Sequence, residues 1–247
     1  PDFSEVGRKP TGAVVIDWGH PLAKGLIAYH TLNDLQDLAR GRTLEAQAND
    51  LPEKSKDGYI FDGASQNGLR AKDPWFKGSE YQQLTIVTSV TPATTTNTAH
   101  CISSREGASG DRYYIFQNGS NFLVYVGNTH LGTSTPITAN QRMTMALMRD
   151  DQDGYGYRDG KLFASQTNTV SDTDGTPLLA FGNYGAAATS GNCFEGTIHW
   201  VGIWDRLLNT EEHREMHNNP YQFLKPEIPL TYFFAAEEVA AAFKAYW

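Results

Sequence analysis

The sequence predicts an all-β fold in which two antiparallel sheets pack face to face, with one short helix and a helical C-terminal tail. Short apolar runs bounded by Gly, Pro, Asp or Asn recur along most of the 247 residues, as they do in a sandwich or barrel. Asn118-Gly119 and Asp159-Gly160 each join two such runs, and both dipeptides are typical of tight hairpin turns. Helical composition is confined to two segments, 209–218 and 235–246.

The expected strands follow one another along the chain. The opening segment has one short apolar run, 13–16, between Pro10 and Pro21, which predicts an extended arm with an edge strand. Further strands are expected at 26–29, 59–61, 84–90, 113–116, 122–126, 143–147, 155–157, 162–163 and 194–205. Within Met143-Thr-Met-Ala-Leu147 the larger apolar residues alternate with smaller ones, which predicts one strongly apolar face.

The strand over 194–205 is expected to be covered on both faces. Simple alternation separates two sets of side chains, with Ile198, Trp200 and Trp204 on one side and His199, Val201 and Ile203 on the other.

Two helices complete the expected fold. Asn209 lies three residues before Glu212 and resembles a capping box, so a short helix is expected to run to about residue 218 before Pro220 ends it. The tail over 235–246 is rich in Ala and Glu and has an apolar stripe. We therefore expect an N-terminal arm (1–24), one sandwich domain (25–229) and a helical tail (230–247).

Composition narrows the range of partners. The net charge is −8 and the 20 basic residues form no run, so nucleic acid is not expected to bind. No apolar stretch approaches the roughly 18 residues of a membrane span, and the N-terminus lacks the apolar core of a signal peptide. Cys101 and Cys193 are too few for a disulfide scaffold; one bridge or two buried free thiols are both open.

Several segments resemble one known family in order and spacing. Gly25 to Asp34 resembles the first core strand of laminin-G-like jelly rolls, and Phe194 to Glu212 resembles their terminal strand and the short helix after it. Further similarities lie in Tyr59-Ile-Phe-Asp-Gly63, in Leu84 to Pro92 and in Arg158-Asp-Gly-Lys161. The resemblance implies a concanavalin A-like jelly roll. The flanks, 16–25 and 219–226, resemble those of laminin-G-like proteins encoded by bacteriophages and prophages, which implies a virion component.

Catalysis is not expected. Glycoside hydrolases also occur on this fold, but retaining enzymes need two carboxyl groups about 5 to 5.5 Å apart. Glu195 is alone on its expected strand, and the Asp pairs 151/153 and 172/174 sit next to Gly in expected loops. His213-Arg-Glu-Met-His217 has the histidine spacing of zinc proteases but lacks a Glu directly after the first His, which favours a solvated helix face.

A calcium site is one of two interpretations of the stretch from residue 150 to 154. Asp150, Asp151 and Asp153 offer three carboxylates, and calcium prefers oxygen ligands. No bidentate Glu closes the set, and a polar hairpin turn explains the same residues equally well. Calcium is therefore possible, and no cofactor is expected to be required.

Aromatic residues near expected loops are the candidate ligand contacts, because sugar rings stack on exposed aromatic faces. They are Trp75, Tyr113, Tyr155, Tyr157 and Tyr184. Packing in the core or at the rim is the alternative for each of them.

The main functional expectation is a non-enzymatic virion protein of a bacteriophage, such as a capsid decoration or other surface-displayed protein. It would be anchored through its arm and tail to other virion subunits, capsid proteins included, and would self-associate, with Trp18, Phe243, Tyr246 and Trp247 as interface anchors. Its expected place is the particle surface, or otherwise outside the cell. The alternative is a carbohydrate-binding lectin or adhesin module that binds surface glycans for host attachment.

Overall fold

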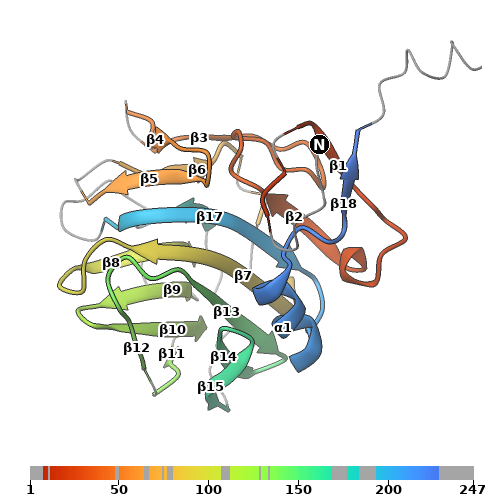
Figure 1. The fold of residues 1–247 in the computed structure, drawn as a ribbon. Helices are drawn as coiled ribbons and strands as arrows, with labels where there is room; N and C mark the ends of the chain where they lie inside the picture. Colours follow the sequence, from red (N-terminus) through yellow and green to blue (C-terminus); the bar gives the residue numbers. More distant parts are fainter. Residues whose placement is uncertain are drawn as a thin grey trace, which may run out of the picture.

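Two antiparallel sheets pack face to face in the computed structural model, as predicted, and a smaller third layer covers one of them (Figure 1). The structure describes residues 8–10, 12–47, 50–63, 67–73, 75–76, 80–106, 112–127, 129–132, 134–167, 177–183 and 193–227.

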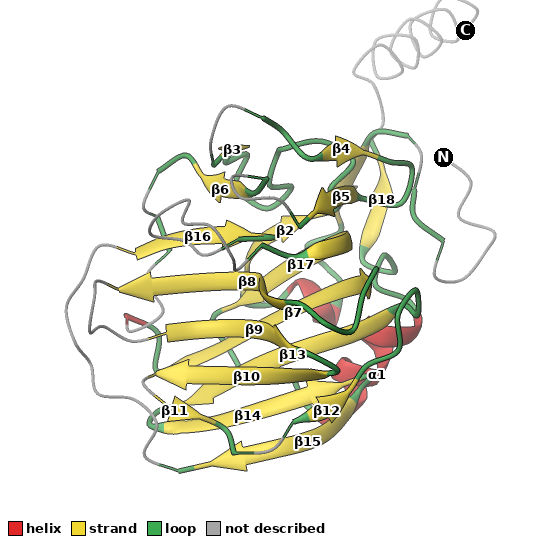
Figure 2. Cartoon of the chain, turned by 90° about the vertical axis from the view of Figure 1, so that its left-hand side faces the viewer, coloured by secondary structure: helices red, strands yellow, loops and turns green. Residues whose placement is uncertain are grey.

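The first sheet, here called the front sheet, faces the viewer in Figure 2. Its strand order is β11-β10-β9-β8-β16-β6-β3, and β12 also pairs with β10. The strands are β3 (Leu44–Ala46), β6 (Leu69–Ala71), β8 (Thr98–Glu106), β9 (Arg112–Asn118), β10 (Asn121–Gly127), β11 (Thr129–His130), β12 (Thr135–Pro136) and β16 (Pro177–Phe181).

The second sheet, the back sheet, has the order β15-β14-β13-β7-β17-β5-β4, and β2 also pairs with β17. The strands are β2 (Leu26–His30), β4 (Glu53–Lys54), β5 (Tyr59–Asp62), β7 (Gln83–Pro92), β13 (Met143–Asp150), β14 (Asp153–Arg158), β15 (Lys161–Gln166) and β17 (Glu195–Trp204). All the strands expected from the sequence after residue 24 are present, some of them longer than expected.

The third layer lies on the outer face of the back sheet. It consists of the two-stranded ribbon β1 (Val14–Ile16) with β18 (Leu224–Pro226), the 3-10 turn η1 (Pro21–Ala23) and the helix α1 (Thr210–Asn218). Residues 12–24 of the expected arm are therefore folded against the sandwich. The expected tail, 230–247, lies outside the described residues.

The sandwich has two apolar cores. The larger lies between the two sheets and includes Met143, Met145 and Leu147, the apolar face predicted for β13. The smaller lies between the back sheet and the third layer, and Trp200, Trp204 and Leu22 belong to it.

The predicted faces of β17 need correction. Both faces are covered, but Ile198, Val201 and Ile203 share the larger core while Trp200 and Trp204 share the smaller one. The register shifts between Ile198 and Trp200 and again between Ile203 and Trp204. The shift after Ile198 leaves His199 as an extra residue in β17 and reverses the alternation that follows it, so simple alternation placed Ile198 on the wrong side. The shift after Ile203 leaves Ile27 of β2 as the extra residue and does not change the alternation of β17.

Both predicted hairpins are present. Asp159 and Gly160 are the two central residues between β14 and β15, and both have positive φ angles (49° and 76°), as a type I′ turn requires. In the β9–β10 hairpin the central residues are Gly119, with φ 58°, and Ser120, whereas Asn118 still pairs with Asn121 in the ladder. A Gly at the first central position is the pattern of a type II′ turn.

The helix α1 begins as predicted. Asn209 accepts a hydrogen bond from the backbone N–H of Glu212, whose carboxylate accepts one in return from the backbone N–H of Asn209. Arg206 donates two hydrogen bonds to the same carboxylate, at 2.9 and 2.7 Å, and another to the carbonyl oxygen of Lys24. The capping box and this arginine fix the start of α1 against η1.

Cys101 and Cys193 are both buried and are not joined by a disulfide, which decides between the two alternatives left open above. Burial raises the pKa of the Cys101 thiol, so it stays protonated at neutral pH. Within the described part of the chain, no helix is both long enough and apolar enough to cross a membrane.

Candidate functional site

The outward face of the front sheet carries an aromatic surface that belongs to neither core. Alternation along β9 turns Tyr113, Ile115 and Gln117 inward and leaves Tyr114 and Phe116 outward, since Tyr113 and Ile115 belong to the larger core. The strands β8, β9 and β10 stand side by side toward the viewer in Figure 2.

Strand register arranges the outward side chains in three cross-strand rows. The rows are Thr98–Asn118–Asn121 at the hairpin end, then His100–Phe116–Leu123, then Ser103–Tyr114–Tyr125–His130. We call these ten residues the aromatic face. Its rings contact one another across the strands, with centroids 4.6 Å apart for His100 and Phe116, 5.8 Å for Tyr114 and Tyr125, and 5.4 Å for Tyr125 and His130.

Exposure within the aromatic face is uneven. Four of the ten residues are buried, namely His100, Ser103, Tyr114 and Leu123. Phe116 and Tyr125 are partly exposed, and Asn118 is exposed at the hairpin end. Burial lowers the pKa of His130, so its ring is neutral at neutral pH. The face thus offers aromatic rings and amide groups side by side, with little fixed charge.

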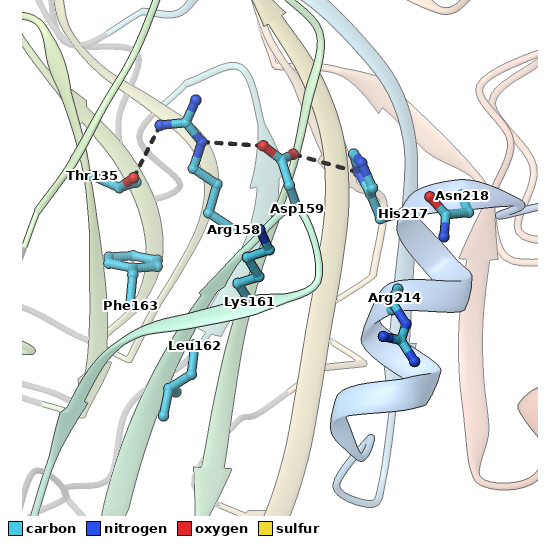
Figure 3. A pocket seen from close by; sticks show the side chains of 9 residues that line it. All are labelled: Thr135, Arg158, Asp159, Lys161, Leu162, Phe163, Arg214, His217 and Asn218. Carbon is cyan, nitrogen blue, oxygen red and sulfur yellow. Dashed lines mark hydrogen bonds and ion pairs between the residues drawn. The ribbon is translucent and has the colours of Figure 1, made fainter.

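A second surface is the groove between the β14–β15 hairpin and α1 (Figure 3). Its volume is about 530 Å³. The lining residues are Thr135, Arg158, Asp159, Lys161, Leu162, Phe163, Arg214, His217 and Asn218.

Asp159 is the centre of a chain of polar contacts along the groove, drawn as dashed lines in Figure 3. Its carboxylate accepts hydrogen bonds from Arg158 Nε (3.2 Å) and from the backbone N–H of Thr144 (2.8 Å), and lies 3.4 Å from His217 Nδ1. Arg158 also donates to Thr135 Oγ1 at 3.1 Å. These contacts hold the hairpin, the neighbouring strand β13 and α1 together.

A family model described as the concanavalin A-like lectin/glucanases superfamily matches residues 57–212. The chain belongs to this superfamily. The match runs from just before β5 into α1 and covers more than half of the chain. It confirms the predicted jelly-roll sandwich and the laminin-G-like resemblance.

Solved structures show the same superfamily fold. Domain 4 of an extracellular arabinanase from Geobacillus stearothermophilus, in complex with arabinotriose, has a TM-score of 0.62 and 18% identity, over 78% of this chain and 98% of that chain. The Trypanosoma rangeli sialidase in complex with sialic acid has a TM-score of 0.63 and 17% identity, over 81% of this chain. That match spans 33% of the sialidase chain. No curated protein sequence matches.

Two of the five predicted ligand residues lie in the interior of the fold. Tyr113 is fully buried between the sheets, where its hydroxyl accepts a hydrogen bond from Arg149 Nη1 at 3.0 Å. Tyr157 is buried beneath α1 and stacks on His213 at 4.0 Å. Neither can contact a ligand on the surface, so those two predictions were wrong.

The other predicted ligand residues have different surroundings. The guanidinium of Arg42 lies 4.0 Å above the ring of Trp75 and occupies that ring face. Tyr155 is partly exposed on β14, on the side of the smaller core. Tyr184 lies outside the described residues. Neither Trp75 nor Tyr155 belongs to the aromatic face or lines the groove.

The predicted calcium residues form the β13–β14 hairpin turn. Asp151 is a central residue of the turn with a φ of 53°, and Asp150 Oδ1 accepts a hydrogen bond from Gln83 Nε2. Asp150 and Asp151 line an open acidic hollow together with Glu80 and Asp205, but Asp153 does not. Across the described ranges, no three His, Cys, Asp or Glu side chains are grouped so that they could hold a metal ion.

One other prediction about a polar residue was wrong. His213 is buried rather than solvated, and burial lowers its pKa to about 4. Glu195 is the one carboxylate on β17, as expected, but Asp62 on β5 lies directly opposite it in the register. Glu195 accepts a hydrogen bond from Asn97 Nδ2 at 3.0 Å, and neither acid lines the groove.

Of the predicted interface anchors, Trp18 is 58% exposed in the turn after β1. Phe243, Tyr246 and Trp247 lie outside the described residues. The interface predictions stay predictions.

The aromatic face was missed at the sequence level, although a signal was present. Successive residues of a strand point to opposite faces of the sheet, and β9 has aromatic residues on both faces, for example Tyr113 and Tyr114. When the inward-facing side chains of a strand are already apolar, aromatic residues among the outward-facing ones indicate a surface that binds a ligand or a partner.

Proposed function

We propose that this protein is a carbohydrate-binding module and that the aromatic face of the front sheet is its ligand surface. The observation that supports this most is the cross-strand arrangement of the partly exposed rings of Phe116 and Tyr125 next to the amides of Asn118 and Asn121.

This combination matches the chemistry of a sugar. The C–H face of a pyranose or furanose ring packs on an aromatic ring, and the hydroxyl groups around its rim form hydrogen bonds with amides. Asn118 and Asn121 lie one row away from Phe116 on the same face, within the span of one saccharide unit.

The comparisons support a saccharide as the ligand. The arabinanase domain of similar fold was solved with arabinotriose, and the sialidase of similar fold was solved with sialic acid. Neither relation gives the ligand of this chain, but both favour glycan binding over the expected role in a virion. That role, with its location on a particle, stays a prediction from the flanking segments.

Replacing Tyr125 with alanine is expected to weaken glycan binding about tenfold or more, because the sugar loses a partly exposed aromatic ring on which to stack. Tenfold corresponds to about 1.4 kcal/mol, within the range of a single aromatic contact. The measurement is isothermal titration calorimetry with arabinotriose and a panel of neutral oligosaccharides. Thermal unfolding confirms that the variant is folded.

Tyr155→Ala is the matched control, since Tyr155 is also a partly exposed tyrosine on a strand but lies on the other sheet. We expect its binding to equal that of the wild type. If Tyr155→Ala lost binding and Tyr125→Ala kept it, the ligand would bind the back sheet, and our assignment to the front sheet would be wrong. Absence of binding across the whole panel would overturn the proposal.

We also propose that the module does not hydrolyse its ligand. The opposed carboxylates Asp62 and Glu195 are the pair that tests this, because they are cross-strand neighbours. Incubation with arabinan and with sialyl-oligosaccharides is expected to release no product, measured as reducing ends or free sialic acid. Turnover that disappears in Glu195→Gln would contradict the expectation.

A further inference from the structure

The groove between the β14–β15 hairpin and α1 has a charge opposite to that of the whole chain. Three of its nine lining residues are cations, Arg158, Lys161 and Arg214, against a single carboxylate, Asp159. The whole chain has a net charge of −8. A local positive potential on an acidic protein favours an anionic ligand at that place.

The carboxylate in the groove does not neutralise all three cations. Asp159 already accepts hydrogen bonds from Arg158 and from the backbone N–H of Thr144, and it also lies beside His217. Lys161 forms no ion pair with any described residue. Arg214 pairs with Glu211, but both side chains are more than half exposed, and such surface pairs contribute little, so a ligand can replace Glu211 easily.

The backbone positions from which the two available cations extend are fixed relative to each other. A Cβ atom on Gly160 would lie 2.8 Å from the Cα of Arg214, so the tip of the hairpin abuts the helix directly. The start of α1 is fixed by its capping box and by Arg206. Lys161 and Arg214 therefore project from two elements that cannot move apart without breaking this contact, which reduces the entropy lost on binding.

The same groove has an apolar part. Leu162 is 52% exposed, and Phe163 lines the groove beside it (Figure 3). A ligand with a negative group and an apolar C–H face would satisfy both parts. A carboxylate suits the planar fork of an arginine.

We propose that this groove is a second ligand site, which binds the carboxylate group of an acidic saccharide such as a hexuronic acid. The site goes beyond the proposed function and takes from it only that the ligand is a saccharide. Two available cations match one carboxylate group, whereas a run of acidic residues in a peptide would need a longer basic surface.

The experiment compares trigalacturonate with its methyl ester, because esterification removes the charge and keeps the sugar. We expect calorimetry at low ionic strength to give at least tenfold tighter binding of the acid. The preference should fall as salt is added, since exposed charges are screened. The double variant Lys161→Gln/Arg214→Gln is expected to bind acid and ester equally, while Lys24→Gln, an exposed lysine outside the groove, keeps the preference.

The proposals for the aromatic face and for the groove can be tested independently. Tyr125→Ala is expected to weaken arabinotriose binding and to leave the ratio of acid to ester unchanged, and the double variant is expected to bind arabinotriose like the wild type. Equal binding of acid and ester by the wild type, or an undiminished preference in the double variant, would overturn the proposal. Tighter binding of a short poly-glutamate peptide, lost in the double variant, would also overturn it in favour of an acidic peptide.

Discussion

Replacing Trp204 with alanine is expected to lower the free energy of unfolding by about 3–5 kcal/mol, as is typical when a fully buried tryptophan is truncated. Trp204 has no exposed surface and belongs to the smaller core, between the back sheet and the third layer. Its Nε1–H donates a hydrogen bond to the carbonyl oxygen of Leu22 at 2.7 Å. Truncation therefore removes apolar contacts and leaves a buried carbonyl without its partner.

Denaturant unfolding measures this effect, and Trp18→Ala is the matched control. Trp18 is 58% exposed, so its replacement is expected to change stability by no more than about 0.5 kcal/mol. A third variant, Trp204→Phe, keeps most of the apolar area and loses the hydrogen bond. Its loss in free energy of unfolding should lie between those of Trp204→Ala and Trp18→Ala. A loss below about 1 kcal/mol for Trp204→Ala would mean that the third layer does not pack on the back sheet as described.

Replacing Asp37 with alanine is expected to be nearly as damaging, with a loss of about 2–4 kcal/mol. The side chain is buried, and its carboxylate accepts hydrogen bonds from the backbone N–H groups of Tyr29 (2.7 Å), Ala39 (2.9 Å) and Arg40 (3.2 Å). Leaving a buried donor without an acceptor costs about 1–3 kcal/mol, and the N–H of Tyr29 is in the middle of a buried strand.

Two variants make this second prediction specific. Asp37→Asn retains one acceptor oxygen and is expected to lose less stability than Asp37→Ala, because Tyr29 and Ala39 share the same carboxylate oxygen. Asp34→Ala removes a similar local contact, to the N–H of Gln36 at 2.9 Å, but an exposed one. It should change stability by less than about 1 kcal/mol. Equal losses for Asp34→Ala and Asp37→Ala would show that burial does not set the size of the effect.

The features that the sequence predicted correctly depend on local chemistry. Asp159-Gly160 forms the expected turn because these two residues tolerate positive φ angles wherever they stand. Asn209 and Glu212 form the expected capping box because both partners lie within one turn of the helix. The resemblance of ordered segments then gave the fold, since their spacing matches one family.

The features that could not be predicted from the sequence depend on contacts between segments that are distant along the chain. The bulge at His199 in β17 put Ile198 and Trp200 on opposite sides of the sheet, and the residue types in the strand do not indicate where a bulge occurs. Tyr113 and Tyr114 are adjacent aromatic residues, but only the pairing of β9 with β8 and β10 assigns one to the larger core and the other to the outward side of the front sheet. The groove likewise joins a hairpin to a helix more than 50 residues away in the sequence.

The ribbon of β1 and β18 also determines how the domain responds to force. Val14 pairs with Pro226, and the backbone N–H of Glu227 donates to the carbonyl oxygen of Ala13, so the chain enters and leaves the domain at one corner. Tension applied between residues 10 and 227 would load the contact of Asn33 with the carbonyl oxygen of Pro10 and then this ribbon, whose hydrogen bonds would open one pair at a time. The front sheet, with the aromatic face, lies outside that load path and would keep its shape while the ribbon yields.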